Sequence, residues 1–92
     1  MRILWTEGAQ QDRDSIEEYV ALDNPRAALR TVIRLTRKIQ DQLAKYPYSG
    51  KMGTAEGTRK LVFPDLPYIA IYAVRDDVVI VISVFHTSQR VG

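Results

Sequence analysis

The feature that most constrains the fold is a long amphipathic segment, residues 25–46. Asn24 can cap the exposed N–H groups of a helix, and Pro25 suits the first helical position, where a missing donor costs nothing. Placed at about 100° per residue, the apolar residues share one broad arc: Ala28, Leu29, Val32, Ile33, Leu35, Ile39, Leu43 and Tyr46. The opposite arc is basic: Arg26, Arg30, Arg34, Arg37, Lys38 and Lys45. The segment therefore predicts a helix that ends near Tyr46, before Pro47, and buries one face.

Two shorter elements are expected before this helix. Residues 2–6 alternate apolar and polar side chains and predict a short strand. Residues 9–22 predict a first helix, with Glu7 at its positive end and a narrow apolar stripe of Ile16, Tyr19 and Val20. Its other faces are acidic: Asp12, Asp14, Glu17 and Glu18.

The second half of the chain has the composition of β-strands. Residues 58–63, 68–74 and 78–86 are rich in β-branched and aromatic residues, which favour strands. Turns at residues 64–67 and 76–77 join them, so an antiparallel meander is expected. The predicted order is β-α-α-β-β-β: one α+β domain, residues 1–92, with two N-terminal helices packed on a mainly antiparallel sheet.

The predicted sheet has more apolar surface than two helices can cover. The run from Val78 to Ile82 offers no polar face, and residues 69–74 offer little more. Large exposed apolar patches on proteins usually mark an interface, so a protein partner is expected. The alternative is that long side chains and the C-terminal tail cover this surface.

Composition excludes several classes of protein. The 92-residue chain has no cysteine and a single histidine, His86. A disulfide scaffold, a cysteine-ligated zinc finger and a thiol nucleophile are therefore excluded, and neither a metal nor a cofactor is expected. The longest apolar run is too short to span a bilayer and no signal peptide precedes it, so a cytoplasmic protein without a membrane partner is expected.

Charge is unevenly distributed along the chain. Residues 1–23 hold two basic groups against six acidic ones, residues 24–60 hold nine against two, and residues 61–92 hold two against three. The net charge of +2 therefore hides a strongly basic middle segment. Such a segment is either a solvated helix face or a docking surface.

One group of residues has the chemistry of RNA cleavage. His86 or Glu56 could move protons, while Arg59 and Arg90 could stabilise phosphate charge. This interpretation expects the start of strand 58–63 and the end of strand 78–86 to lie on one side of the sheet. A structural histidine at a strand end is the plainer alternative. Five tyrosines raise the question of base stacking, but only Tyr48 is expected at the surface, because core packing explains the other four: Tyr19, Tyr46, Tyr68 and Tyr72.

Four stretches in order resemble a known family. They are Asn24-Pro25-Arg26-Ala27-Ala28; Gly57-Thr58-Arg59-Lys60-Leu61-Val62 with Leu66-Pro67-Tyr68-Ile69; Ile71-Tyr72-Ala73-Val74-Arg75; and Ile82-Ser83-Val84-Phe85-His86, ending Gln89-Arg90. Together they resemble the RelE/ParE superfamily of toxins from bacterial type II toxin–antitoxin modules. The resemblance covers nearly the whole chain.

The resemblance implies a toxin neutralised by a cognate antitoxin that covers its apolar surface. RelE-type members cut mRNA in the ribosomal A site, whereas ParE-type members inhibit DNA gyrase and carry no nuclease site. This chain matches the ParE-like strand motifs better. Thr87 stands where some of the ribonucleases have tyrosine, and Arg90-Val91-Gly92 ends the chain where relatives often carry tryptophan.

A gyrase inhibitor is therefore the leading hypothesis, and a ribosome-dependent mRNA endonuclease using Arg59, His86 and Glu56 is the alternative. A nucleic-acid-binding module using the basic helix is a third possibility. The residues expected to bind the antitoxin or the target are basic: Arg26, Arg30, Arg34, Arg37, Arg59, Arg75 and Arg90.

Overall fold

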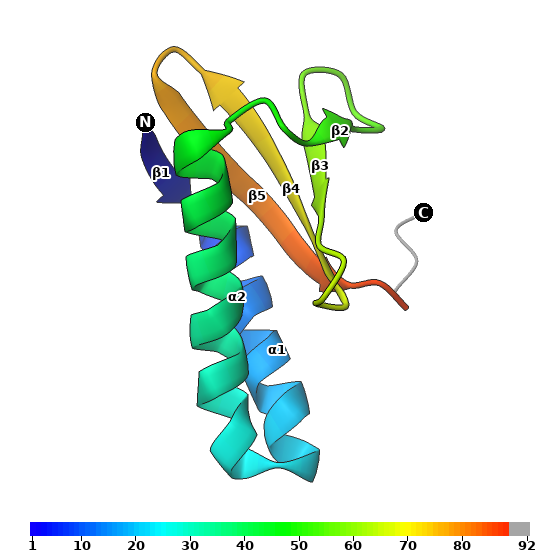
Figure 1. Cartoon of the computed structure of the whole chain (residues 1–92). Helices are drawn as coiled ribbons and strands as arrows, with labels where there is room; N and C mark the ends of the chain where they lie inside the picture. Colours follow the sequence, from blue (N-terminus) through cyan, green and yellow to red (C-terminus); the bar gives the residue numbers. More distant parts are fainter. Residues whose placement is uncertain (89–92) are drawn as a thin grey trace.

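The computed structural model describes residues 1–88, which form two helices and a five-stranded sheet. The elements are β1 (Arg2–Trp5), α1 (Glu7–Asp23), α2 (Pro25–Lys45), β2 (Lys51–Met52), β3 (Arg59–Val62), β4 (Tyr68–Arg75) and β5 (Val78–His86). The two helices form a hairpin on one side of the sheet, and its turn projects beyond the sheet (Figure 1). The predicted α+β class, with two N-terminal helices on a mainly antiparallel sheet, is confirmed. Strand β2 was not predicted, because two residues are too few for a pattern.

The strand order is β1-β5-β4-β3-β2. Strand β1 pairs with β5 in parallel, and the other three pairs are antiparallel. Because the first and last strands are neighbours, the start of the chain lies against its last strand. Strands β3 and β5 both run antiparallel to β4, so they share one direction, which decides where the candidate site residues lie.

Helix α1 begins earlier than the sequence pattern indicates. The hydroxyl of Thr6 accepts a hydrogen bond from the N–H of Ala9 at 3.0 Å, and the helix starts at Glu7. This is N-capping, which satisfies a donor that has no partner inside the helix. The first strand therefore ends one residue earlier than expected, at Trp5, and helix α1 begins about two residues earlier than expected.

Helix α2 has the expected ends. The side chain of Asn24 accepts from the N–H of Ala27 at 3.1 Å, and Pro25 occupies the first turn. At the other end the N–H of Tyr46 donates to the carbonyl of Gln42 at 2.8 Å. The capping residue and the proline thus fix the start of the helix through local geometry, as the sequence predicted.

The core lies between α2 and the inner face of the sheet. Five α2 side chains are buried: Ala28, Val32, Leu35, Ile39 and Leu43. They form one cluster with inward-facing sheet residues that include Tyr72, Val79 and Val81, all fully buried. The buried arc of α2 is narrower than predicted.

Several side chains expected in the core are exposed instead. Leu29, Ile33 and Tyr46 are 57%, 41% and 60% exposed, and Tyr19 on α1 is 70% exposed. Leu29 and Ile33 lie at one flank of the apolar arc, and Tyr46 follows the end of α2. Of the four tyrosines expected in the core, only Tyr68 and Tyr72 are buried.

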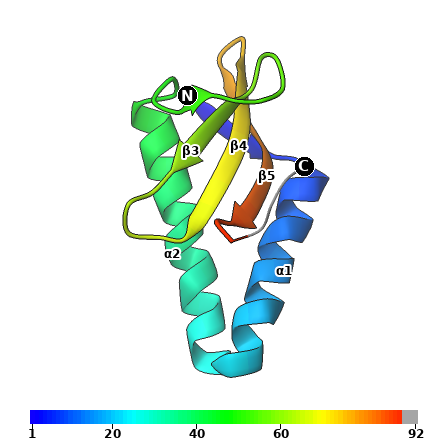
Figure 2. The ribbon, with the colours of Figure 1, turned by 90° about the vertical axis from the view of Figure 1, so that its right-hand side faces the viewer.

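No helix covers the outer face of the sheet (Figure 2). Alternation along the strands places Leu4, Val62, Ile71 and Ile80 on this face, opposite to their buried neighbours. Leu4 and Val62 are about half exposed, at 45% and 51%. Neither helix is long and apolar enough to cross a membrane, within the part of the chain that the structure describes.

Candidate functional surfaces

His86 ends β5 and lies beside a groove. Its ring meets that of Tyr68 edge to face, with 5.4 Å between the centroids. The N–H of Ser88 donates to Nδ1 of His86 at 3.1 Å, and the Ser88 hydroxyl lies 2.7 Å from the same nitrogen. Two polar groups of Ser88 therefore lie within hydrogen-bond distance of one nitrogen of the imidazole ring.

The groove beside His86 has a volume of about 490 Å³ between α1 and the end of β5. Asp12 lines it, and its carboxylate accepts from the N–H of Val84 at 2.9 Å and from the hydroxyl of Ser83 at 3.1 Å. Burial raises the pKa of the Tyr68 hydroxyl, and nearby Tyr19 raises it further. Tyr68 therefore stays protonated at neutral pH.

Arg59 holds a loop in place. Its guanidinium donates from Nη1 to the carbonyls of Tyr48 and Gly50, at 3.1 and 2.9 Å. It also lies 5.2 Å from the centroid of the Tyr48 ring, a cation–π distance. The arginine thus satisfies two carbonyls of the loop between α2 and β2, and this role was not predicted.

The structure does not bring Arg59 and His86 together. Arg59 pairs with Tyr72 of β4, whereas His86 pairs with Tyr68. At about 3.3 Å per residue, the two sites are about 13 Å apart along β4, and they lie on opposite sides of that strand. The expectation of one shared site is therefore wrong, because β3 and β5 run in the same direction.

Glu56 and Arg75 lie at the Arg59 end of the sheet. Glu56 is exposed in the turn before β3, beside Gly57, whose φ of +80° favours glycine. Arg75 ends β4, and its Nη2 atom is 3.5 Å from the position that a Cβ on Gly57 would take. Arg90 lies outside the described residues.

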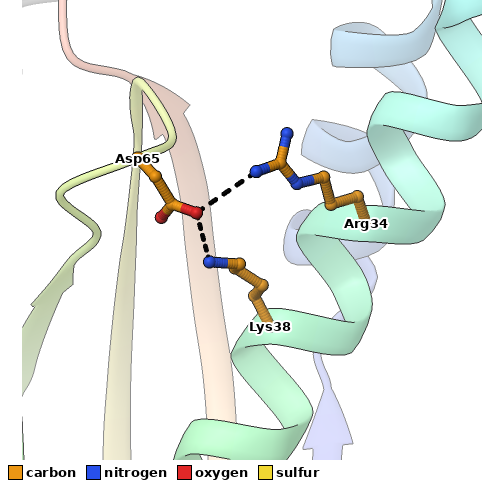
Figure 3. A network of polar contacts seen from close by, with 3 residues as sticks. All are labelled: Arg34, Lys38 and Asp65. Atoms are coloured by element: carbon orange, nitrogen blue, oxygen red, sulfur yellow. Dashed lines mark hydrogen bonds and ion pairs between the residues drawn. The ribbon is translucent and has the colours of Figure 1, made fainter.

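Two of the basic residues of α2 are occupied within the chain. Arg34 Nη2 lies 3.2 Å from a carboxylate oxygen of Asp65, and Lys38 Nζ contacts the same oxygen (Figure 3). The hydrogen bond from Lys38 is the main cause that lowers the pKa of Asp65. The sequence did not predict this contact, because nothing local places the loop between β3 and β4 against α2.

We expect Asp65→Asn to lower the stability of the folded protein at neutral pH but not in strong acid. Because the folded-state pKa of Asp65 is lowered, its contribution to stability is present above about pH 4 and is lost as pH falls through that lowered pKa. Thermal unfolding followed by circular dichroism should show a small decrease in midpoint for the variant at neutral pH. The decrease should vanish in strong acid, and an equal decrease at both pH values would contradict the interpretation.

The remaining basic residues of α2 point to solvent. Arg26, Arg30 and Arg37 are exposed. In residues 1–88 the ion pairs are those of Arg34 and Lys38 with Asp65, so these three arginines make none. The same part of the chain holds no group of three acidic, histidine or cysteine side chains placed to bind a metal.

Comparisons with known proteins agree on a family. A family model described as the ParE toxin of the type II toxin–antitoxin system parDE matches residues 3–91. Y4kP of Sinorhizobium fredii, named as a candidate toxin, is 43% identical over 89 residues, which cover 97% of this chain and 91% of Y4kP. Toxin RelE2 of Caulobacter vibrioides is 33% identical over 88 residues, 96% of this chain and 97% of RelE2.

Solved structures share the fold. The chromosomal ParDE system of P. aeruginosa contains a chain with a TM-score of 0.84 at 21% identity, covering 94% of this chain and 95% of that one. The intact RelBE toxin–antitoxin complex of E. coli gives a TM-score of 0.64 at 22% identity, covering 97% and 98%. At these identities the likeness concerns the fold alone.

Proposed function

The chain belongs to the ParE toxin family, and from that premise we propose that it inhibits growth by binding DNA gyrase until a cognate antitoxin neutralises it. It is the toxin component of a type II toxin–antitoxin system. The proposal places the toxin in the cytoplasm, where it would meet gyrase. It needs no chemistry from the toxin itself, only a binding surface.

The observation that carries the choice of gyrase is the separation of Arg59 from His86. Cleavage of RNA by attack of the 2′-hydroxyl needs a proton acceptor and a cation at the same phosphate. Here the guanidinium of Arg59 is bound to two loop carbonyls, and His86 lies at the opposite end of the sheet. An inhibitor that acts by binding is compatible with this arrangement.

Supercoiling by purified gyrase tests the proposal. We expect the toxin to inhibit conversion of relaxed plasmid to the supercoiled form, and purified antitoxin to restore it. Heat-denatured toxin serves as the control for nonspecific protein. Supercoiling that proceeds normally with the toxin in large excess over gyrase would refute the proposal.

The groove beside His86 favours a second candidate, ribosome-dependent mRNA cleavage. Its lining combines His86 with Tyr19, which is 70% exposed, and an exposed aromatic side chain can stack on an unpaired base. The test is mRNA cleavage in a translation extract, with His86→Ala and Arg59→Ala compared with the wild type and Glu56→Gln as a further variant. Cleavage that survives His86→Ala would eliminate the groove as the site, and cleavage that survives Arg59→Ala would show that Arg59 takes no part in it.

The antitoxin is the partner expected at the uncovered surfaces. The outer face of the sheet exposes Leu4 and Val62, and α2 exposes three arginines. Of the arginines expected to bind a partner, Arg34 and Arg59 already have partners within the chain. The proposal therefore rests on Arg26, Arg30, Arg37 and Arg75 for binding.

A further inference from the structure

Two large side chains are exposed beside Arg59, at the edge of the sheet. Tyr48, in the loop between α2 and β2, is 61% exposed, and Met52 of β2 is 80% exposed. Met52 is the partner of Arg59 in the β2–β3 register, so their side chains lie on the same face of the sheet. The Cζ atom of Arg59 lies 5.2 Å from the centroid of the Tyr48 ring. The three residues therefore form one continuous surface, which we call the Tyr48 patch.

The loop that carries Tyr48 is held in place although it is exposed. Nη1 of Arg59 donates to the carbonyls of Tyr48 and Gly50, at 3.1 and 2.9 Å. On the other side of the loop, Nε2 of Gln42 donates to the hydroxyl of Ser49 at 3.2 Å. A side chain on a fixed backbone loses less conformational entropy when it binds a partner. The Tyr48 patch is therefore preorganised for recognition.

The composition of the Tyr48 patch is typical of the centre of a protein interface. Tyrosine, methionine and arginine are enriched there, and tyrosine and arginine carry much of the binding energy. Neither Tyr48 nor Met52 belongs to the buried cluster of the core. Packing within the chain therefore does not account for these two side chains, and a partner does.

The geometry favours a protein over a nucleic acid as that partner. A single-stranded nucleic acid needs cations along its phosphates beside the ring on which a base stacks. Arg59 is the cation in contact with the Tyr48 ring, and its Nη1 is bound to two loop carbonyls. Alternation along β2 and β3 places Lys51 and Lys60 on the opposite face of the sheet. A chain of phosphates running past Tyr48 would therefore miss both lysines.

The Tyr48 patch is separate from the outer face of the sheet and from the start of α2. Figure 1 shows β2 at the end of the molecule opposite the turn of the helical hairpin. Met52 and Arg59 lie on the face of the sheet opposite to Val62. Arg26 and Arg30 lie in the first two turns of α2, close to the hairpin turn. Substitutions in the patch can therefore be made without touching these surfaces.

We propose that the Tyr48 patch is the surface by which the toxin docks on gyrase, an inference that rests on the proposed inhibition of that enzyme. Tyr48 and Met52 enter an apolar pocket of gyrase, and Arg59 holds the loop that presents Tyr48. Lys51 and Lys60, on the reverse side of the same strands, are exposed and form no ion pair within residues 1–88. Their positive charge next to the patch favours an acidic surface around that pocket.

Inhibition of supercoiling by variants of the patch tests the inference. We would compare the half-inhibitory concentration of the wild type with those of Tyr48→Ala/Met52→Ala and Leu22→Ala/Leu29→Ala. The second double variant is the matched control, because it also removes two large exposed side chains, 82% and 57% exposed, but from the helices. We expect about a 30-fold rise for the patch variant and less than about threefold for the control. Circular dichroism would verify that both variants fold.

Two further measurements separate docking on gyrase from a structural role. Tyr48→Phe keeps the aromatic ring beside Arg59 and should inhibit gyrase within about threefold of the wild type. Isothermal titration calorimetry with the purified antitoxin should give equal affinities for the wild type and Tyr48→Ala/Met52→Ala. A folded patch variant that inhibits gyrase as well as the wild type does would overturn the inference and leave the proposed inhibition intact. A wild type that does not inhibit gyrase would refute the proposed function, and the inference with it.

Two other occupants are outcomes of the same experiments. If Tyr48→Ala/Met52→Ala loses affinity for the antitoxin as well as inhibition of gyrase, the patch is an antitoxin surface and the inference is overturned. Fluorescence anisotropy with a labelled oligothymidine tests the other occupant. Tight binding by the wild type that the patch variant lacks would make the patch a nucleic-acid surface and would overturn the inference as well.

Discussion

Leu35→Ala is expected to destabilise this toxin more than any other single substitution considered. Leu35 is 1% exposed at the centre of α2 and belongs to the buried cluster beneath the helix. Removing its side chain loses the transfer free energy of the deleted atoms and leaves a cavity, at a cost of about 2–5 kcal/mol. In a domain of this size, each kcal/mol lowers the melting temperature by about 4–8 °C.

Leu29→Ala is the matched control for this prediction. It makes the same chemical change on the same helix, but Leu29 is 57% exposed, and exposed substitutions usually change stability by less than about 0.5 kcal/mol. Urea unfolding of both variants should give similar slopes and very different midpoints. Equal midpoints would show that α2 does not bury the face described above.

Gly50→Ala is the second substitution expected to lower stability strongly, because the added Cβ would crowd its neighbours. Gly50 is buried, and its N–H donates to the hydroxyl of Tyr72 at 2.9 Å. A Cβ at this position would lie 2.7 Å from that hydroxyl and 2.9 Å from the carbonyl oxygen of Lys60. The backbone of the loop and of β3 must therefore separate. Overpacking of this kind costs about 1–3 kcal/mol, and an unpaired Tyr72 hydroxyl adds to the cost.

Gly8→Ala controls for the loss of glycine itself. A Cβ on Gly8 would make ordinary contacts at 3.8 and 3.9 Å, and alanine favours a helix over glycine by up to about 1 kcal/mol. We expect Gly8→Ala to be neutral or stabilising and Gly50→Ala to unfold at a markedly lower temperature. Two variants with the same melting temperature would contradict the close approach of Gly50 to Tyr72.

The elements themselves follow from local patterns in the sequence. Asn24 and Pro25 fix the start of α2 by capping geometry, and the period of its apolar residues identifies the face that packs on the sheet. The limits of that face were harder to predict. Leu29 and Ile33 were assigned to the same apolar arc as Leu35, yet they are exposed, because at about 100° per residue they lie about 120° and 160° around the helix from Leu35.

The candidate site was predicted less well than the fold. Local chemistry placed Arg59 and His86 at strand ends, but it did not identify the carbonyls that Arg59 binds or the Tyr68 ring that His86 meets. Arg59 binds the carbonyls of Tyr48 and Gly50, and Asp65 reaches Arg34 and Lys38 on α2. Contacts between segments far apart in the chain depend on how the elements pack, and no local pattern encodes that packing.

The sequence by itself determined the class of fold, the helical hairpin with its capped ends, and the opposite charges of the two helices, because these depend on residues close together in the chain. The tertiary structure alone decided that Arg59 and His86 lie apart, that Asp65 pairs with two of the basic groups of α2, and that Arg30 and Arg37 make no ion pair within residues 1–88. The physical reason is that strand order and direction place side chains across the sheet, and pairing between distant strands sets both.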